Sequence, residues 1–368
     1  MNQSTRSGAQ RLAFLDWTRG LAALIMLQGH VFHSFTATHL RQDGPYVLSQ
    51  FVGGITPAVF LFLTGVTLAF LMDSSSRKGL SPWQRTWAAA RRSGYLLLIA
   101  FLFRFQMWSF SFGKSPWTDL FKVDILNCMG LGIIVLSPLA IFSTRDRIRF
   151  GAVSGLFIAG AAPLISAADW GWLHPFARAW VVPDPNFFSL FPWAAFIAFG
   201  LAAGSLLRVV EHGAMGRMME WWALFGITLI VGARYFANLP YSVYPHSDFW
   251  LNSPALVLIK TGIILMIAAF AYLWTSYVNT GWSFLRQLGS TSLLVYWVHT
   301  ELVYGNWFWR WKESLSVPQT VAAAAFIILL MLGLSIARTG WKGGPGLLAV
   351  LRQKWTGWRA QPVPQAGD

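Results

Sequence analysis

Long apolar stretches alternate with short polar ones along almost the whole chain. Most apolar stretches run for about 20 residues, which is the length that an α-helix needs to cross the hydrocarbon core of a bilayer. The pattern predicts ten membrane-spanning helices, at residues 12–35, 51–72, 84–105, 120–142, 148–168, 187–208, 219–237, 253–276, 284–306 and 318–338. We therefore expect an all-α polytopic membrane protein.

Turn-forming clusters separate the predicted spans. They read DGP at 43–45, SSS at 74–76, KSP at 114–116, PDP at 183–185 and GGP at 343–345. No segment between spans is long enough to fold alone. Residues 1–340 are therefore predicted to form one transmembrane domain, and residues 341–368 a basic cytoplasmic tail. The first apolar stretch is expected to be retained as a helix, because polar residues interrupt it and no small-x-small cleavage site follows.

Composition supports a membrane protein over a soluble one. The 368 residues are 55% hydrophobic and only 11% charged, whereas soluble domains carry about 25% charged residues. The 21 tryptophans fit the aromatic belts found at membrane interfaces. In a soluble protein a net charge of +14 would suggest nucleic acid. Here the basic residues cluster between apolar stretches, so no nucleic-acid partner is expected.

The basic residues also predict an orientation. If the N-terminus lies inside, the inner segments hold 18 lysines and arginines. The outer segments hold six: Arg41, Lys114, Arg178, Arg234, Arg310 and Lys312. Because cytoplasmic loops carry an excess of such residues, both termini are predicted to be cytoplasmic.

Several chemistries have no sequence support. Cys128 is the only cysteine, so neither an intramolecular disulfide nor a thiolate metal cluster is expected. The chain has no HExxH and no Cys/His array, so no metal is expected. A nucleophile elbow, a P-loop and a dinucleotide fingerprint are also missing from the sequence.

The first predicted helix carries four ionisable side chains on one stripe. At about 100° per residue, Asp16 lies about 60° from Arg19, His30 about 20° on the same side, and His33 about 40° on the other. Gln28 lies opposite. Arg19 and His30 are separated by about 16 Å along the axis. One face thus offers a cation near the cytoplasm and imidazoles near the outer side.

Ionisable groups inside a span cost about 2.5–3.5 kcal/mol each on insertion scales and usually serve a function. Structural alternatives stay open. Asp16 and Arg19 could simply pair while the arginine reaches the interface. His30 could be a neutral histidine bonded to a neighbour, and His33 could be merely interfacial.

Other predicted spans bring polar residues to the same outer half of the membrane. His299 lies there on the ninth span and shares a helix face with Tyr296. Asp124 and Asn127 lie near the outer end of the fourth span. Trp193 of the sixth span and Lys260 of the eighth also lie in the outer half. Together they predict a polar cavity that opens outward, with Arg19 on its cytoplasmic side.

Five sequence blocks resemble one superfamily. The first, FLDWTRGLAALIMLQGH, resembles the first helix of transmembrane acyltransferases, and Arg19 and His30 have the Arg-x10-His spacing of bacterial membrane O-acyltransferases. The other four are PAVFLFLTGVTLAF, DILNCMGLGIIVL, FSLFPWAAFIAFGLAAG and GSTSLLVYWVHTELVY. They resemble, in order, the catalytic domain of heparan-alpha-glucosaminide N-acetyltransferase and its bacterial relatives, the branch we favour.

Two departures qualify the resemblance. The animal enzyme has a large outer N-terminal domain that this sequence lacks, so heparan itself is not the expected acceptor. In that enzyme the proposed active histidine lies in an outer loop beyond the first core helix. His33 or His39 could therefore correspond to it in place of His30.

The resemblance implies transfer of an acyl group, usually acetyl, from cytoplasmic acyl-CoA to a hydroxyl or amine of a sugar-like acceptor outside. The charged nucleotide would stay at the basic inner rim while the thin pantetheine arm enters the protein. In this scheme Arg19, with Asp16 beside it, holds the donor. The arm would pass Ala22, Ala23 and Met26.

The implied chemistry needs a base for the acceptor and a donor for the oxyanion. We expect His30 to be the base, with His299 as a second candidate or as a group that orients the acceptor. Asp124 could set the tautomer of a histidine. Asn127 or Tyr296 could donate to the oxyanion. An acyl-histidine intermediate is equally compatible with the sequence.

The acceptor is expected to be a carbohydrate or glycolipid. His33, Trp193, Tyr296 and Lys260 are the expected acceptor-binding residues. The expected location is the bilayer of a bacterial inner (plasma) membrane, and a homodimer is compatible with the sequence.

Two other classes of function stay open. A transporter or flippase for a lipid-linked sugar or small anion would also use buried histidine, aspartate and arginine. Such proteins often show inverted repeats, which are not evident here. A scaffold would use polar residues only as contacts between helices, which accounts poorly for His30 and His299 at matched depth.

Overall fold

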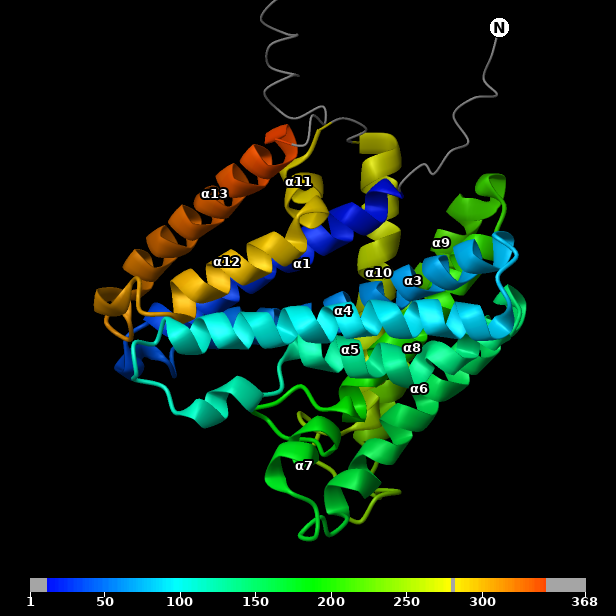
Figure 1. Cartoon of the computed structure of the whole chain (residues 1–368), viewed down its shortest axis with the longest axis horizontal. Helices are drawn as coiled ribbons and strands as arrows, with labels where there is room; N and C mark the ends of the chain where they lie inside the picture. Colours follow the sequence, from blue (N-terminus) through cyan, green and yellow to red (C-terminus); the bar gives the residue numbers. More distant parts are fainter. Residues whose placement is uncertain (1–11, 279–281, 342–368) are drawn as a thin grey trace, which may run out of the picture.

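A computed structural model of the chain describes residues 12–278 and 282–341, and most of these residues are helical (Figure 1). The α-helices are α1 (Ala13–Phe35), α2 (Gly44–Gly53), α3 (Thr56–Arg77), α4 (Pro82–Ser109), α5 (Ile125–Leu136), α6 (Thr144–Ala167), α7 (Pro175–Val181), α8 (Leu190–Val209), α9 (Met215–Ala237), α10 (Pro254–Leu273), α11 (Phe284–Ser290), α12 (Ser292–Tyr304) and α13 (Val317–Trp341).

Short helical turns join several of these helices. They are the 3₁₀ turns η1 (Thr38–Leu40), η2 (Trp117–Phe121), η3 (Ser137–Ile141), η4 (His212–Ala214) and η6 (Trp309–Trp311), and the π-helical turn η5 (Trp274–Val278). Within the described residues the strand-like pairing is a single bridge between Thr36 and Leu315.

Helices occupy all ten stretches predicted to span the membrane. Among the residues that the structure describes, six helical stretches are long and apolar enough to cross it: Gly44–Arg77, Trp117–Ile141, Thr144–Ala167, Leu190–Val209, Pro254–Val278 and Val317–Gly340. The chain is thus an all-α, multi-pass membrane protein. The other four predicted spans coincide with α1, α4, α9 and the pair α11–α12, and their crossing of the bilayer stays a prediction.

The predicted cytoplasmic termini also stay a prediction. Residues 1–11 and nearly all of the predicted basic tail at 341–368 lie outside the described residues.

Local sequence explains where many helices begin. Ser81 accepts a hydrogen bond from the backbone of Gln84, whose side chain bonds back to Ser81, and Pro82 occupies the first turn of α4. This capping box supplies hydrogen-bond acceptors for backbone N–H groups that have no partner within the helix. Ser253 caps α10 in a similar way, again with a proline in the first turn.

The ninth predicted span is interrupted, which the sequence pattern did not indicate. Thr291 lies between α11 and α12 with φ −122° and ψ 19°, outside helical geometry. Its hydroxyl is 2.6 Å from that of Ser335 on α13, and Gln287 donates to the Ser335 carbonyl oxygen at 3.0 Å. The Ser335 hydroxyl also donates at 3.0 Å to the Gln287 carbonyl oxygen, which has lost its helical partner because Thr291 N–H donates to Leu288 instead.

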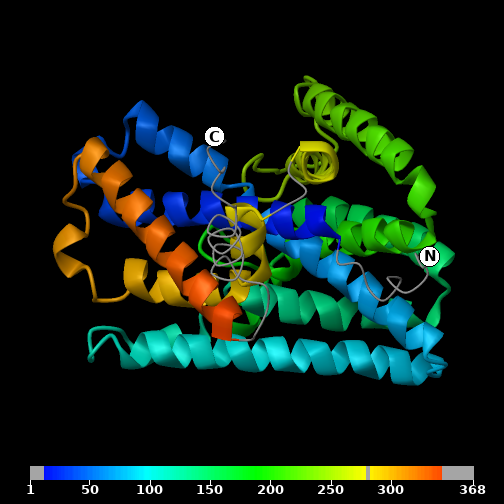
Figure 2. The ribbon, with the colours of Figure 1, turned by 90° about the horizontal axis from the view of Figure 1, so that it is seen from above.

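The helices pack as two adjoining groups. One apolar core joins α3, α5, α6, α8 and α10 with the first half of α1, and a second joins the later half of α1 with α12 and α13. Figure 1 shows α1 and α12 running alongside each other behind the long helix α4. From above, α4 lies along one edge of the molecule and α9 toward the opposite edge (Figure 2). Helix α1 is thus enclosed by others.

Glycines permit the closest helix crossings. A Cβ atom added to Gly20 of α1 would overlap the carbonyl oxygen of Leu285, and one added to Gly289 of α11 would overlap that of Asp16. Because such backbone approach leaves no room for a side chain, small residues mark helix contacts in membranes. The Gly20–Gly289 crossing fixes α11, and with it α12, against α1.

A charged cluster closes the end that is predicted to face the cytoplasm. The Asp73 carboxylate accepts hydrogen bonds from Arg208 Nε at 2.7 Å and Thr144 Oγ1 at 3.2 Å, and it pairs with Arg77 at 2.9 Å. Arg147, which is fully buried, donates to Thr144 Oγ1 at 2.7 Å. These bonds tie together α3, α6 and α8.

Candidate functional site

Two histidines far apart in sequence meet where α1 and α12 run alongside each other. His30 Nδ1 and His299 Nε2 are 2.9 Å apart, and the two rings stack with centroids 5.1 Å apart. His299 is fully buried, whereas His30 is half-buried. The sequence placed both residues at the same depth, and the structure brings them into direct contact.

Hydrogen bonding specifies which ring nitrogens carry protons. His299 Nδ1 lies 2.7 Å from the Val295 carbonyl oxygen. Because a carbonyl can only accept, this nitrogen must be the donor. With both rings neutral, His299 Nε2 then holds a lone pair and accepts the Nδ1–H of His30. The lone pair of His30 therefore resides on Nε2, which has no hydrogen-bond partner among the described residues.

This arrangement resembles the way an orienting group fixes a catalytic histidine. A partner on one ring nitrogen sets the tautomer and holds the plane of the ring, and the other nitrogen stays ready to take a proton. His299 fills that place for His30. The Val295 carbonyl orients His299 in the same way. The sequence had suggested Asp124 for this role.

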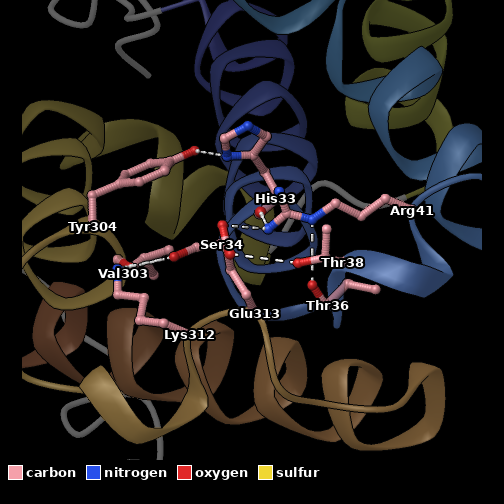
Figure 3. Close-up of polar contacts among 9 residues, drawn as sticks. All are labelled: His33, Ser34, Thr36, Thr38, Arg41, Val303, Tyr304, Lys312 and Glu313. Carbon is pink, nitrogen blue, oxygen red and sulfur yellow. Dashed lines mark hydrogen bonds and ion pairs between the residues drawn. The ribbon is translucent and has the colours of Figure 1, made fainter.

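Tyr304 extends the site toward its outer end. Its ring lies edge-on to that of His30 with centroids 5.2 Å apart, and its hydroxyl is 3.4 Å from His33 Nδ1 (Figure 3). Tyr296, predicted to share a face with His299, has its ring 6.0 Å from that of His299 and 5.4 Å from that of Phe103. Two tyrosines and a third histidine, the exposed His33, therefore lie beside the pair.

The loop before α13 clamps the end of α1. The backbone N–H of Glu313 donates to the Ser34 carbonyl at 3.0 Å, and those of Ser314 and Leu315 donate to the Phe35 carbonyl at 3.1 and 2.9 Å. The last carbonyls of a helix have no partner within it. These bonds supply partners, and they hold the turn that carries His33 in place.

Arg41 adds a second clamp on the same helix end. Its guanidinium donates to the carbonyl oxygens of His33 at 3.0 Å and Thr36 at 3.4 Å, and it pairs with Glu313 at 3.1 Å (Figure 3). A cation at the C-terminus of a helix is favoured by the helix dipole. The end of α1 is thus fixed by both backbone and side-chain contacts.

Lys312 is half-buried between α1 and α12. Its ammonium donates to Ser34 Oγ at 2.9 Å and to the Val303 carbonyl, and it lies 5.7 Å from the centre of the Tyr304 ring (Figure 3). Burial lowers the pKa of Lys312 to about 8, while the neighbouring Glu313 opposes the shift. In the unfolded chain the pKa is near 10.5.

This shift predicts a pH-dependent stability. Between about pH 8 and pH 10.5 the folded protein releases the Lys312 proton while the unfolded chain keeps it. Stability therefore gains from this group as pH rises through that window. Thermal unfolding of the wild type and of Lys312→Met, in detergent from pH 7 to pH 10, should show a more favourable slope for the wild type above pH 8. Parallel slopes would contradict the prediction.

Asp124 and Asn127 lie at the start of α5. Asp124 caps the helix by accepting from Leu126 and Asn127 N–H at 3.0 and 3.2 Å, and the Asn127 side chain accepts from Asp124 N–H at 3.1 Å. The other Asp124 carboxylate oxygen is 3.2 Å from Arg104 Nε, an ion pair without hydrogen-bond geometry. Both residues therefore contact their own helix and α4, not the histidine pair.

Arg19 and Asp16 form the pair that the sequence allowed. Arg19 Nη1 is 3.1 Å from Asp16 Oδ1, and both side chains are largely buried, with 20% and 12% exposed. Along α1, Arg19 lies about 16 Å and Asp16 about 21 Å from His30. Ala22, Ala23 and Met26, between them, are buried among neighbouring side chains. Passage of a pantetheine arm along this face would require α1 to separate from its neighbours.

Trp193 and Lys260 lie together, but on other helices. The Lys260 ammonium is 5.2 Å from the centre of the Trp193 ring, across the contact between α8 and α10. Within the described part of the chain, neither contacts His30 or His299 by a hydrogen bond, ion pair or ring contact. The structure therefore places them as a separate pair.

Sequence reasoning missed several residues near the site. The sequence did not point to Tyr304, because it lies five positions after His299 and therefore about 140° away around the same helix. Glu301 is buried and accepts from Trp307 at 3.2 Å and Gln106 at 3.5 Å, and Gln106 accepts from Trp297 at 2.7 Å. This network joins α4 to α12 behind the histidine pair.

The described residues contain no group of three or more His, Cys, Asp or Glu side chains placed to hold a metal ion. The groups at the site are the imidazoles of His30 and His299, the phenol of Tyr304 and the ammonium of Lys312.

A comparison with curated proteins gave no match. The profile of one protein family matches residues 11–235 and is described as heparan-alpha-glucosaminide N-acetyltransferase, catalytic. The match includes all of α1, with His30, and ends within α9, so His299 lies beyond it. It covers well over half of the chain. The chain therefore belongs to the family of the heparan-alpha-glucosaminide N-acetyltransferase catalytic domain.

Proposed function

We propose that this protein transfers an acetyl or other short acyl group from cytoplasmic acyl-CoA to an amine or hydroxyl of a sugar-like acceptor on the outer side of the membrane. The observation that supports the proposal is the hydrogen bond between His30 and His299, which leaves Nε2 of His30 able to accept a proton, in a chain that belongs to an acetyltransferase family. The family membership supports membrane acetyl transfer in general. The donor, the acceptor and the direction are part of the proposal.

In the proposed reaction His30 Nε2 takes the proton of the acceptor N–H or O–H. The acceptor atom attacks the thioester carbon, the carbonyl oxygen becomes negative, and its collapse expels the CoA thiolate. His30 then returns the proton to the sulfur. His299 accepts the Nδ1–H of His30 throughout, which keeps the proton-accepting nitrogen pointed at the acceptor.

The oxyanion needs a donor near the acceptor. Tyr304 is suited to this role because its ring adjoins that of His30 and its hydroxyl lies 3.4 Å from His33. Tyr296 is a second candidate, since it neighbours His299. We keep His33 as an acceptor-binding residue. In this proposal Asp124 and Asn127 act indirectly. They fix the start of α5, and Asp124 also holds Arg104.

The donor is proposed to approach from the opposite end of α1. Arg19, held by Asp16, would contact the phosphate or amide groups of acyl-CoA where the nucleotide meets the membrane. The pantetheine arm would then pass Ala23 and Met26 to reach His30. Because both side chains are buried, the arm can enter only when α1 moves relative to its neighbours.

An acyl-His30 intermediate is a second form of the same activity. The unpartnered Nε2 could attack the thioester directly, and the acceptor would then attack the acyl-imidazole. Release of CoA from the protein before acceptor is added would distinguish this route from direct transfer. The alternative of a transporter or flippase is less favoured, because the chain belongs to an acetyltransferase family.

Donor binding tests the proposal directly. Purified protein in detergent should bind acetyl-CoA, and Arg19→Ala should weaken that binding by about tenfold, the loss expected for one charge-assisted contact. Equilibrium titration checks this. The control is Arg234→Ala, near the end of α9 that is predicted to lie outside. Equal binding by wild type and Arg19→Ala would indicate that Arg19 serves only its pair with Asp16.

A further inference from the structure

Four arginines meet at the end of the molecule that is predicted to face the cytoplasm. They are called here the arginine cluster and comprise Arg77 at the end of α3, Arg85 in the first turn of α4, Arg147 in the first turn of α6 and Arg208 near the end of α8. Arg85 also reaches α3, because its Nη1 donates to Ser76 Oγ at 3.3 Å. The cluster thus links the ends of four helices.

The positive charges of the arginine cluster are only partly neutralised. Asp73 pairs with Arg77 and Arg208, and its negative charge also favours the cationic form of Arg147. Asp146, the acid next to Arg147 in the sequence, forms no ion pair among the described residues. One paired carboxylate therefore serves four guanidinium groups, and the cluster keeps a positive surplus.

Arg147 is fully buried, yet two of its three guanidinium nitrogens have no acceptor. Nη2 donates to Thr144 Oγ1 at 2.7 Å, whereas Nε and Nη1 have no hydrogen-bond partner in the part of the chain that the structure describes. Arg85 Nε is likewise buried without an acceptor, and the charge of Arg85 opposes that of Arg147. Because buried guanidinium groups are costly unless paired, this position favours an anion.

Helix α8 contributes another donor at the same level. Ser205 is fully buried, and its hydroxyl has no partner among the described residues. The start of α6 and the end of α8 both bind Asp73, so these helices run in opposite directions. Gly151 of α6 packs against Ala202 of α8. One turn from this contact, Arg147 is therefore level with Ser205. Donors from α4, α6 and α8 suit an anion with several oxygens, such as phosphate.

The arginine cluster lies at the edge of the molecule. Both Figure 1 and Figure 2 place the turn between α3 and α4 at an outer corner. Trp83 and Trp87, one turn apart on α4 and flanking Arg85, are exposed at 76% and 57%. Exposed tryptophans near a helix end are typical of the membrane interface, where lipid headgroups lie. The headgroup layer is therefore the nearest source of phosphate.

We propose that the arginine cluster binds the headgroup phosphate of an acidic phospholipid in the cytoplasmic leaflet. The phosphate oxygens accept from the unpartnered N–H groups of Arg85 and Arg147. Arg85 is half-buried and the Arg77 side chain is 62% exposed, so these long side chains swing aside to admit the headgroup. The bound lipid joins the start of α4 to the start of α6.

The positive surplus also selects the kind of lipid. A zwitterionic headgroup carries an ammonium or choline group next to its phosphate, and the remaining arginines repel that group. An acidic headgroup lacks this repulsion, and clusters of arginine on the cytoplasmic side attract such lipids. Acyl-CoA carries phosphates too, but its proposed path follows α1 beside Arg19, whereas the arginine cluster belongs to α3, α4, α6 and α8.

Thermal unfolding of the purified protein in a neutral detergent tests the proposal. Phosphatidylglycerol should raise the unfolding temperature by about 5 °C when it is well above its dissociation constant. Phosphatidylcholine, which has the same phosphate beside a positive charge, should raise it much less. Equal shifts with the two lipids would overturn the proposal.

Two matched variants locate the binding site. Arg85→Gln should remove the response to phosphatidylglycerol. Arg145→Gln removes the same charge from an exposed position two residues before Arg147, and it should keep the response. A response that survives Arg85→Gln, or that both variants lose equally, would show that the lipid does not bind between Arg85 and Arg147.

Native mass spectrometry of the wild type gives a reading that does not depend on how well a variant folds. One phosphatidylglycerol should stay bound at collision energies that remove phosphatidylcholine. Equal retention of the two lipids would contradict the proposal.

Inorganic phosphate and acetyl-CoA distinguish the other sources of phosphate. Neither should displace the retained phosphatidylglycerol, and Arg85→Gln should bind acetyl-CoA as the wild type does. Displacement by inorganic phosphate would assign the cluster to a free anion. Displacement by acetyl-CoA, or its weaker binding to Arg85→Gln, would assign the cluster to the donor. Either result would overturn the lipid site, and neither requires a measurement of acyl transfer.

Discussion

Replacement of His30 by alanine is expected to lower the rate of acyl transfer by about a hundredfold or more, the usual contribution of a general base. The protein should stay folded and should still bind acetyl-CoA, because His30 lies about 16 Å from Arg19. Transfer of radiolabelled acetyl from acetyl-CoA to an accepted amino sugar measures the effect, with thermal unfolding as a check on structure.

His299 should behave as a positioning residue. His299→Leu removes the acceptor for the Nδ1–H of His30, so transfer should fall by about ten- to a hundredfold. His299→Gln offers an amide oxygen in its place and should recover part of the rate. The pH dependence of transfer should shift in both variants, which a purely structural role would not produce. If His30→Ala is fully active while His299→Leu is inactive, the base is His299.

The second large effect concerns the helix crossing at Gly20 and Gly289. Substitution of either glycine by alanine should prevent normal folding or strongly destabilise the protein. The added methyl would overlap the backbone of Leu285 or Asp16, and a backbone atom cannot move aside as a flexible side chain can. Larger residues such as valine should abolish the folded monodisperse peak in size-exclusion chromatography in detergent.

Gly232→Ala is the matched control for this crossing. Gly232 also lies within a helix, α9, and an added Cβ would meet nothing within 4 Å. Alanine is a better helix former than glycine, so this variant should be as stable as the wild type or more so. Comparable loss of folded protein in Gly20→Ala and Gly232→Ala would show that the crossing is not responsible.

Sequence pattern predicts the helices well because the bilayer imposes one requirement on every span. Backbone groups must be satisfied within the segment, so an apolar stretch such as 253–276 leaves little choice but a helix. The break at Thr291 was not predicted because it depends on contacts with α13. Thr291 reaches the Ser335 hydroxyl, and Gln287 reaches the Ser335 carbonyl oxygen, only after α13 has packed.

The candidate site was likewise predicted only in part. Helical spacing put His30 on a polar stripe, and depth counting matched it to His299. The first argument uses the geometry of a single helix, and the second counts residues along each predicted span to compare their depths in the membrane. They carry no information about which helices are neighbours. Asp124 was therefore considered as a partner for a histidine, although it caps α5 and pairs with Arg104. Tyr304 was missed because it lies about 140° from His299 around α12 and meets His30 only through the packing of α12 against α1.

The contact between α1 and the last part of the chain has a consequence for biosynthesis. His30 on α1 leaves the ribosome well before His299 and the clamp formed by Glu313 and Leu315. Until that clamp arrives, the carbonyls of Ser34 and Phe35 lack these partners. Membrane insertion of the early helices would therefore precede assembly of the histidine pair. A nascent or truncated chain that ends before α12 would carry His30 without the partner that orients its ring.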